Sequence, residues 1–325
     1  MPTTPPPSGT ATAVRLPARP VLLFWSVATL IQIPVATAFL LVGADAELAR
    51  GLAAAGLEFR TDLLAGVLVV IAYPAAALGV ALSLAQVAAP DLAVLGVAAR
   101  RGGRALLRDV AARLRPWSRA VGRRSGLRVW AAAVAVLTLC NLASGFLHRG
   151  LNPEALTWTI GWGTLALLPV AMFLDAGALL EENGWRGFAL PALLRRHTPV
   201  VASLVLGLAW ASWHYLVKFD LFVDYGALGA VAVLAAFTLK IIALTIVITY
   251  FWARSGQSTL LAIAMHGLSN DVARVGGWVE PTTWQVEAVT ELNLAVPLAV
   301  AAAVCVGAAR RNGWGDVRPL GVWRP

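Results

Sequence analysis

The stretch GALLEENGWRGFALPALLRR, from Gly177 to Arg196, places two adjacent carboxylates and an arginine inside a long apolar segment. Such a segment predicts a membrane-embedded helix, in which each buried ionised side chain costs about 2.5 to 3.5 kcal/mol. On a helix, Glu182 and Arg186 lie four residues apart and can neutralise each other. Glu181 lies about 100° around the helix from that pair and has no local partner. An ionisable residue in this position indicates a functional site.

Composition defines the class of protein. Of the 325 residues, 59% are hydrophobic and 13% are charged, which predicts an all-α, polytopic integral membrane protein rather than a soluble fold. Cys140 and Cys305 lie in apolar runs, so neither a disulfide framework nor a cysteine metal site is expected. The net charge of +9 does not predict a nucleic-acid partner, because 10 of the 26 basic residues lie within residues 100–128. That distribution favours contact with the anionic lipid of the inner leaflet.

Apolar runs predict about eight transmembrane helices, because about 20 residues cross a hydrocarbon core of about 30 Å. The second expected span tolerates Pro74. Residues 157–194 exceed one crossing, so they form either a strongly tilted helix or a dipping segment before Pro169 followed by a helix that ends at Arg195. The expected spans are residues 21–42, 63–85, 129–146, 157–194, 199–216, 227–252, 258–272 and 294–309.

The chain divides into four parts. Residues 1–20 are expected to be a disordered cytoplasmic N-terminus. Residues 21–150 hold the first spans and, at about 100–128, a basic cytoplasmic segment whose amphipathic helix lies along the membrane and stops near Pro116. Residues 151–275 hold the core of the predicted site, and residues 276–325 hold the last span and a basic cytoplasmic tail.

The basic residues also predict the orientation. With eight spans, the loop at 100–128, Arg195, Arg254 and the arginines of the tail all fall on one side of the membrane. Because that side is normally the cytoplasm, both termini are expected there. The alanine- and arginine-rich composition indicates a bacterial plasma membrane.

Three of the expected helices carry polar groups at a similar depth. Counted outward from the bend at residues 195–199, Glu181 and His214 are equally distant, each about 25 Å away. His266 and Asn270 are four residues apart on one helical face, and His266 lies about 15 Å from the start of its helix. The spacing therefore predicts a polar cavity within the membrane.

These residue types favour activation of water. A carboxylate in a low-dielectric site is a competent general base near neutral pH, so Glu181 and His214 can hold an attacking water. His266 and Asn270 can donate hydrogen bonds to the oxyanion that develops on a peptide carbonyl. Glu181, His214 and His266 are also an adequate ligand set for zinc or another divalent metal, and the sequence leaves both mechanisms open. Trp210, four residues before His214, joins this cluster on the same helical face.

Three motifs carry a resemblance to a known family. The segments EENGWR (residues 181–186), WASWH (210–214) and HGLSN (266–270) resemble, in order and spacing, the motifs of the CPBP family. That family, also called Abi, includes type II CAAX prenyl endopeptidases and bacteriocin-processing or immunity proteins. The resemblance covers about residues 165–271.

The resemblance implies an eight-helix intramembrane metalloprotease or a related peptidase, and it assigns a role to each motif residue. The implied roles are a catalytic glutamate (Glu181), a supporting pair (Glu182 and Arg186), a water-orienting histidine (His214), and an oxyanion-binding or metal-binding pair (His266 and Asn270).

Two positions depart from the family pattern. Asn183 and Gly184 replace the apolar residues that usually follow the glutamates, and a glycine weakens a helix by about 1 kcal/mol relative to alanine. Trp210 stands where phenylalanine is commoner. Outside the motifs, Lys240 lies in the middle of a span, where it either neutralises Glu182 or Asp175 or lines the cavity.

The function expected from these observations is that of an intramembrane endopeptidase, which hydrolyses a peptide bond of a membrane-associated polypeptide. The alternative is a non-enzymatic membrane immunity or assembly factor that keeps the polar cluster as a structural network. A transporter with a proton relay through Glu181 and Lys240 is less favoured, because no paired hydrophobic halves are present. A bacterial protein is not expected to require prenylated substrates.

Overall fold

The computed structural model describes residues 19–57, 61–151, 162–271 and 283–317, and in these ranges the chain forms helices, turns and irregular segments but no β-strand. A 3₁₀ turn lies at Pro74–Ala76, and π-helical segments lie at Ala98–Gly102 and Asn183–Ala189. The α-helices are α1 (Pro20–Leu41), α2 (Ala44–Ala54), α3 (Leu63–Ala72), α4 (Ala77–Val87), α5 (Ala89–Val97), α6 (Gly103–Ala111), α7 (Arg123–Leu151), α8 (Trp162–Leu174), α9 (Ala176–Glu182), α10 (Leu190–Leu193), α11 (Pro199–His214), α12 (Asp220–Arg254), α13 (Thr259–Asp271) and α14 (Trp284–Asn312).

Four helices, α1, α7, α12 and α14, are long and apolar enough to cross a membrane. A fifth crossing results if α4 and α5, which are bent by 51° relative to each other, count as one span. Helices α3 and α11 are apolar but shorter. The chain is thus an all-α, multi-pass membrane protein, whereas the predicted number of eight spans is not confirmed.

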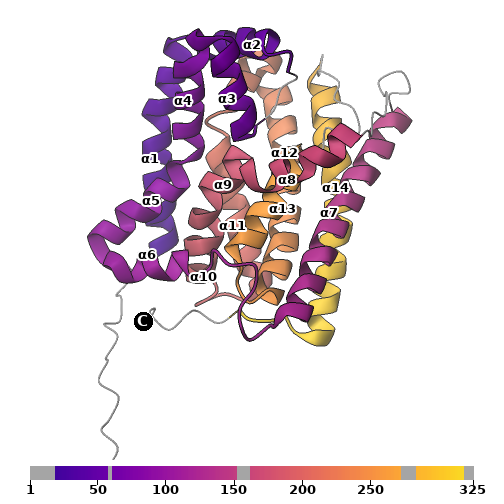
Figure 1. Ribbon diagram of the computed structural model, residues 1–325. Coiled ribbons are helices and arrows are strands. Elements are labelled where there is room, and N and C mark those ends of the chain that lie inside the picture. Colours follow the sequence, from indigo (N-terminus) through magenta and orange to yellow (C-terminus); the bar gives the residue numbers. More distant parts are fainter. Residues whose placement is uncertain (1–18, 58–60, 152–161, 272–282, 318–325) are drawn as a thin grey trace, which may run out of the picture.

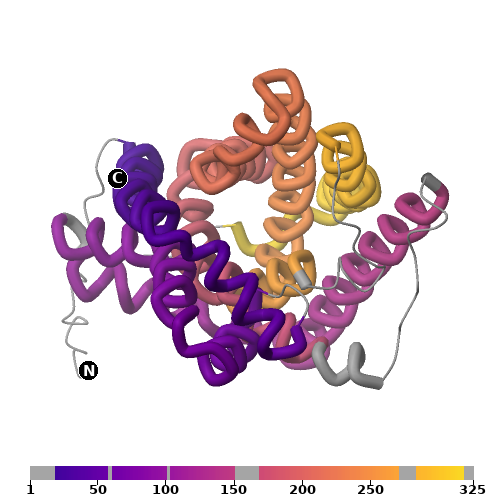
Figure 2. Tube along the Cα trace, turned by 90° about the horizontal axis from the view of Figure 1, so that it is seen from above, coloured from indigo at the N-terminus to yellow at the C-terminus, as the bar shows by residue number. Residues whose placement is uncertain are grey.

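The longer helices surround three shorter ones, α9, α11 and α13 (Figure 1). Helix α12 packs against α11 and α14, and α14 also packs against α7. Helix α1 packs against α4 and α5 (Figure 1). Seen from above, the indigo and purple N-terminal helices form one side of the molecule and α12 and α14 form the other (Figure 2). Helices α9, α11 and α13, which carry the predicted site residues, lie near the centre.

The prediction that residues 63–85 form one span that tolerates Pro74 is wrong. Helix α3 ends at Ala72, and Tyr73 has extended backbone angles (φ −145°, ψ 85°) before Pro74 opens a new turn. A proline disfavours helical geometry in the residue before it and has no N–H to continue the hydrogen-bond ladder. The chain therefore forms two short helices here, and both contact α2.

The long apolar segment from residue 157 is broken, but not where the sequence suggested. Pro169 lies inside α8, and the break falls at Asp175, whose carboxylate accepts a hydrogen bond from Ala178 N at 2.6 Å and so begins α9. The helical run ends next to Arg195, as predicted. The expected dipping segment falls partly on residues 152–161, which lie outside the described ranges.

The predicted amphipathic helix forms, although it ends earlier than expected. In α6, Leu106 and Val110 are buried and Arg104 and Arg108 are exposed. The helix stops at Ala111, before Pro116.

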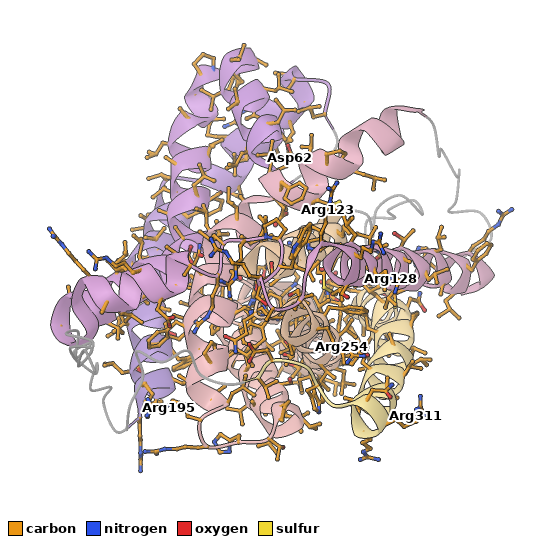
Figure 3. The ribbon with its side chains drawn as sticks, turned by 60° about the horizontal axis from the view of Figure 1, so that its bottom comes forward. Asp62, Arg123, Arg128, Arg195, Arg254 and Arg311 are labelled. Atoms are coloured by element: carbon orange, nitrogen blue, oxygen red, sulfur yellow. The ribbon has the colours of Figure 1, made fainter. Side chains whose placement is uncertain are left out.

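Residues 112–122, which follow α6, dock onto the turn between α12 and α13. Arg113 is fully buried and donates to Asp109 at 2.9 Å and to the carbonyl oxygen of Gly187. Burial lowers the pKa of the Arg113 guanidinium, while the Asp109 carboxylate opposes that effect. Ser118 N donates to Ser255 O at 2.9 Å. This segment therefore covers the end of the bundle at which Arg195, Arg254 and Arg311 lie (Figure 3).

Candidate active site

The site is built on α9, which carries both predicted glutamates into the protein interior. Glu181 is 2% exposed and Glu182 is fully buried. Asp175 caps the N-terminus of this helix and is itself fully buried. Because α9 is only seven residues long, its cap places Asp175 within two turns of both glutamates.

The Glu181 carboxylate is held by two indole groups. Trp210 Nε1 donates to Oε2 at 2.8 Å, and Trp185 Nε1 donates to the same oxygen at 3.3 Å. Trp210 comes from α11, so this bond joins two of the three helices that the sequence placed at matched depth. Because both donors use Oε2, the carboxylate is fixed in orientation and Oε1 is left for another contact.

Gly177 leaves a gap beside Oε1. A Cβ atom at this glycine would lie 3.2 Å from Glu181 Oε1, 3.4 Å from Asp175 Oδ1 and 3.7 Å from Asn270 Nδ2. Two carboxylate oxygens and an amide nitrogen therefore face a single point that no side chain of residue 177 fills. Gly177, Glu181 and Asn270 line the same cavity, so a small polar molecule in the cavity beside Gly177 would lie next to both polar side chains.

Glu182 forms the predicted pair with Arg186, at 2.5 Å between Oε1 and Nη1. The same oxygen is 3.0 Å from His266 Nδ1, so His266 bonds to Glu182 and not directly to Glu181. The Arg186 guanidinium also lies over the Trp210 ring, 4.4 Å from its centroid. The buried Arg186 guanidinium thus packs against the Trp210 indole that donates to Glu181.

Hydrogen bonds fix the two imidazoles in defined tautomers. His214 Nδ1 lies 2.9 Å from Trp210 O, and because a carbonyl only accepts, Nδ1 carries the proton and the neutral ring has its lone pair on Nε2. His266 Nδ1 likewise donates to Glu182. The Trp210 ring centroid is 5.9 Å from that of His214 and 4.8 Å from that of His266. The predicted residues of three helices are therefore brought together around one indole.

Asn183 and Gly184, which depart from the family pattern, lie at the start of the π-helical segment, and their contacts explain why these two residue types are present. Asn183 Nδ2 donates to Asp91 Oδ2 at 2.7 Å, and Gly184 N donates to Asp91 Oδ1 at 2.8 Å. A Cβ at Gly184 would lie 2.8 Å from Pro90 Cβ, too close for any residue but glycine. Helix α5 thus packs directly onto the motif, and π-helical geometry is often found at functional sites.

A cavity of about 1020 Å³ opens onto the cluster. Its polar lining includes Glu181, Trp210, His214, His266 and Asn270, and apolar residues of α3 and α4 form another part of its wall. Lys240 lines this cavity and forms an ion pair with Glu291 at 2.5 Å. Of the two alternatives for Lys240, the cavity lining is therefore the one observed, and its acidic partner is Glu291 rather than Glu182 or Asp175.

Comparison with known proteins agrees with this geometry. Residues 161–272, which span α8 to α13 and hold every predicted site residue, match the family described as type II CAAX prenyl endopeptidase, Rce1-like. This part of the chain is therefore similar to that family. A curated relative, CAAX prenyl protease 2 of Methanococcus maripaludis, is 32% identical over 113 residues. The match covers 32% of this chain and 39% of that relative.

The side chains do not form a ready metal site. Within the described ranges, no three His, Cys, Asp or Glu side chains are grouped to hold a metal ion, including Glu181, His214 and His266. The Nδ1 atom of each imidazole is used by a protein acceptor and Glu181 Oε2 is used by two indoles, which leaves Nε2 of each ring and Glu181 Oε1 for other contacts.

Sequence reasoning missed four residues of the site: Thr61, Asp91, Asp175 and Gly177. Asp175 and Gly177 could have been found, because an aspartate three residues before an apolar helical turn is a capping signal. Thr61 and Asp91 come from the part of the chain outside the CAAX endopeptidase match. Their contacts to Asp175 and to Gly184 span 114 and 93 residues, which no local pattern reveals.

Proposed function

We propose that this protein is an intramembrane endopeptidase that hydrolyses a peptide bond of a membrane-associated polypeptide with water activated by Glu181. One observation carries the proposal. Two indoles fix one oxygen of the buried Glu181 carboxylate, while the other oxygen lies beside Gly177, in the wall of a cavity that Asn270 also lines. A general base and an oxyanion donor thus share one small polar space.

In the first step, water in this gap attacks the peptide carbonyl carbon. Glu181 Oε1 accepts one proton of the water as the new C–O bond forms. His214 Nε2, which carries the lone pair of the neutral ring, accepts the second water hydrogen as a hydrogen bond and so orients the attack. The negative charge moves to the carbonyl oxygen.

Asn270 stabilises that oxyanion. Its Nδ2 atom carries two hydrogens, one of which is donated to Asp175 Oδ1 at 3.1 Å. The other is available to the oxyanion, and His266 is the second donor when its ring is protonated, because Nδ1 is already committed to Glu182. The intermediate then collapses as the C–N bond breaks, and the proton on Glu181 passes to the leaving amine.

The substrate class follows from the cavity and from the relative. A volume of about 1020 Å³ with apolar walls from α3 and α4 suits a peptide with bulky apolar groups. The relative is named as a CAAX prenyl protease, so a prenylated CAAX-box peptide is the first probe, paired with the same peptide without the prenyl group. The pair tests the expectation that prenylation is not required.

The test of the function is Glu181→Gln in purified protein. Glutamine keeps the shape and accepts the same indole bonds but cannot accept a proton, so cleavage of the probe peptide should fall at least 1,000-fold. Leu139→Ala, on the exposed surface of α7, is the matched control and should retain full turnover. Full activity of folded Glu181→Gln would refute the assignment. Binding of a partner protein by folded Glu181→Gln without any cleavage by the wild type would instead favour the immunity or assembly factor.

A separate measurement tests whether the reaction requires a bound metal ion. Zinc or another divalent metal would be held by Glu181 and by Nε2 of His214 and His266, whose Nδ1 atoms keep their present bonds. Metal content of active protein, with activity measured after chelation and again after metal is restored, decides between the mechanisms. Activity that survives complete removal of metal supports hydrolysis by the side chains alone.

We also propose a bacterial plasma membrane location with both termini in the cytoplasm. The basic residues that gather at one end of the bundle, among them Arg195, Arg254 and Arg311, support this orientation (Figure 3). The exposed arginines of α6, Arg104 and Arg108, suit anionic lipid headgroups. Labelling of either terminus in intact and opened cells tests the orientation.

A further inference from the structure

Asp175 connects the proposed oxyanion donor to the N-terminal part of the chain. Its Oδ1 atom accepts from Asn270 Nδ2 at 3.1 Å and from Ala178 N at 2.6 Å. Its Oδ2 atom accepts from Thr61 Oγ1 at 2.5 Å. The side chain is fully buried and receives donors from α9, from α13 and from the segment that precedes α3.

The backbone reinforces this connection. Ala176 N donates to Thr61 O at 3.0 Å, and Asp62 and Asp175 form an isolated antiparallel bridge. Thr61 therefore contacts the Asp175 region through both its main chain and its hydroxyl group. The hydroxyl bond is not needed to cap α9, because Oδ1 alone accepts the Ala178 N–H.

The carboxylate determines which way the Asn270 amide points. A negatively charged acceptor attracts the NH₂ group and repels the amide oxygen, so the amide cannot flip without losing a charge-assisted hydrogen bond. With one hydrogen held by Asp175, the second remains for a group in the cavity that Asn270 and Gly177 line. The orientation of the carboxylate depends in turn on Thr61.

We propose that Asp175 is a positioning residue for Asn270, and that the Thr61 hydroxyl keeps Asp175 in the orientation that turns the amide toward the reacting carbonyl. This inference rests on the proposed function. It makes the N-terminal part of the chain a necessary part of the site, although the family match begins at residue 161. Thr61 also lines the cavity, so the test separates kcat from KM.

The experiment compares Thr61→Val and Thr61→Ser with wild type in detergent-purified full-length protein, using the prenylated peptide probe. Valine removes only the hydroxyl, so kcat should fall about ten-fold while KM stays within about two-fold. Serine should restore most of the rate. Thr29→Val is the matched control, because it also removes a partly buried threonine hydroxyl bond, to Trp25 O in α1. Its kcat should not change.

A double-mutant cycle tests the route through Asn270. If Thr61 acts through that amide, Thr61→Val should cost less than about two-fold in an Asn270→Ala background. A further ten-fold loss there, an unchanged kcat in Thr61→Val, or an equal loss in Thr29→Val would overturn the proposal.

The same cycle scored on unfolding temperature does not depend on catalysis. Non-additive shifts for Thr61→Val and Asn270→Ala support the link through Asp175 even if Glu181→Gln shows that the proposed function is wrong. Additive shifts count against the link whatever the activity.

Discussion

Helix α3 and the π-helical segment Asn183–Ala189 belong to the same site, yet they are built in opposite ways. Every side chain from Gly184 to Leu193 is buried, including the charged Arg186. In α3 only Ala65 and Val69 are buried, and Ile71 is 71% exposed. The difference indicates that the segment whose Trp185 donates to Glu181 is held in place by packing, whereas α3 forms part of the cavity wall.

The largest expected effect concerns the buried ion pair of the rigid segment. Arg186→Met leaves Glu182 buried without its cation, which should lower the free energy of unfolding by about 3 to 5 kcal/mol. Denaturant titration in detergent micelles measures the change. Arg50→Met, which breaks the exposed Glu47–Arg50 pair of α2, is the control and should have no measurable effect. If both variants lowered the free energy of unfolding equally, the buried ion pair of this segment would contribute no more to stability than the exposed pair of α2.

The next effect is on catalysis without loss of fold. Gly177→Ala places a methyl group 3.2 Å from Glu181 Oε1, in the space assigned to the attacking water. Because alanine suits a helix better than glycine, the protein should stay folded while kcat falls at least 100-fold. Turnover of the peptide probe and an unfolding curve check both parts. A stable Gly177→Ala protein with wild-type kcat would show that the gap is not the reaction site.

A smaller effect is expected where the N-terminal part packs onto the motif. In Gly184→Ala the new methyl group lies 2.8 to 2.9 Å from Pro90, so α5 must move, at a cost of about 1 to 3 kcal/mol in stability. Gly307→Ala in α14 meets no atom within 4 Å and should be neutral or slightly stabilising. A neutral Gly184→Ala would mean that α5 can shift freely.

The smallest effect is expected in the wall of the cavity. Val67→Ala in α3 removes apolar surface from the cavity lining and should raise KM for a bulky apolar peptide about three-fold, with kcat unchanged. Leu78→Ala is matched in exposure, 55% for each residue, but Leu78 does not line the cavity. Its KM should equal that of the wild type. A change in kcat for Val67→Ala would assign α3 to the chemistry.

The parts of the site that sequence predicted are those that a regular helix determines. The Glu182–Arg186 pair follows from four-residue spacing on one helix. Counting helical rise on two arms of a hairpin placed His214 level with Glu181, whereas the residue of that motif that bonds Glu181 is Trp210, one turn away. Helical rise gives depth but not rotation. For that reason it could not tell that His266 bonds to Glu182.

The remaining features depend on contacts between distant parts of the chain. The break at Tyr73 was missed because a proline inside an apolar run can be tolerated or can end a helix, and only the surroundings decide. Arg113 was expected at a lipid surface, yet it is buried against Asp109 and Gly187. No spacing rule connects residue 113 with residue 187.

The π-helical winding of Asn183–Ala189 also limits which changes in gene length the protein tolerates. A π-helical turn holds more residues than an α-helical turn, so loss of one residue here would let the segment rewind into ordinary α geometry while α10 keeps its orientation. Gain of a further residue would instead rotate the chain beyond it by about 100°, and Leu190 and Leu193 would leave their buried positions. Single-residue insertions are therefore expected to be tolerated less well in this stretch than single-residue deletions.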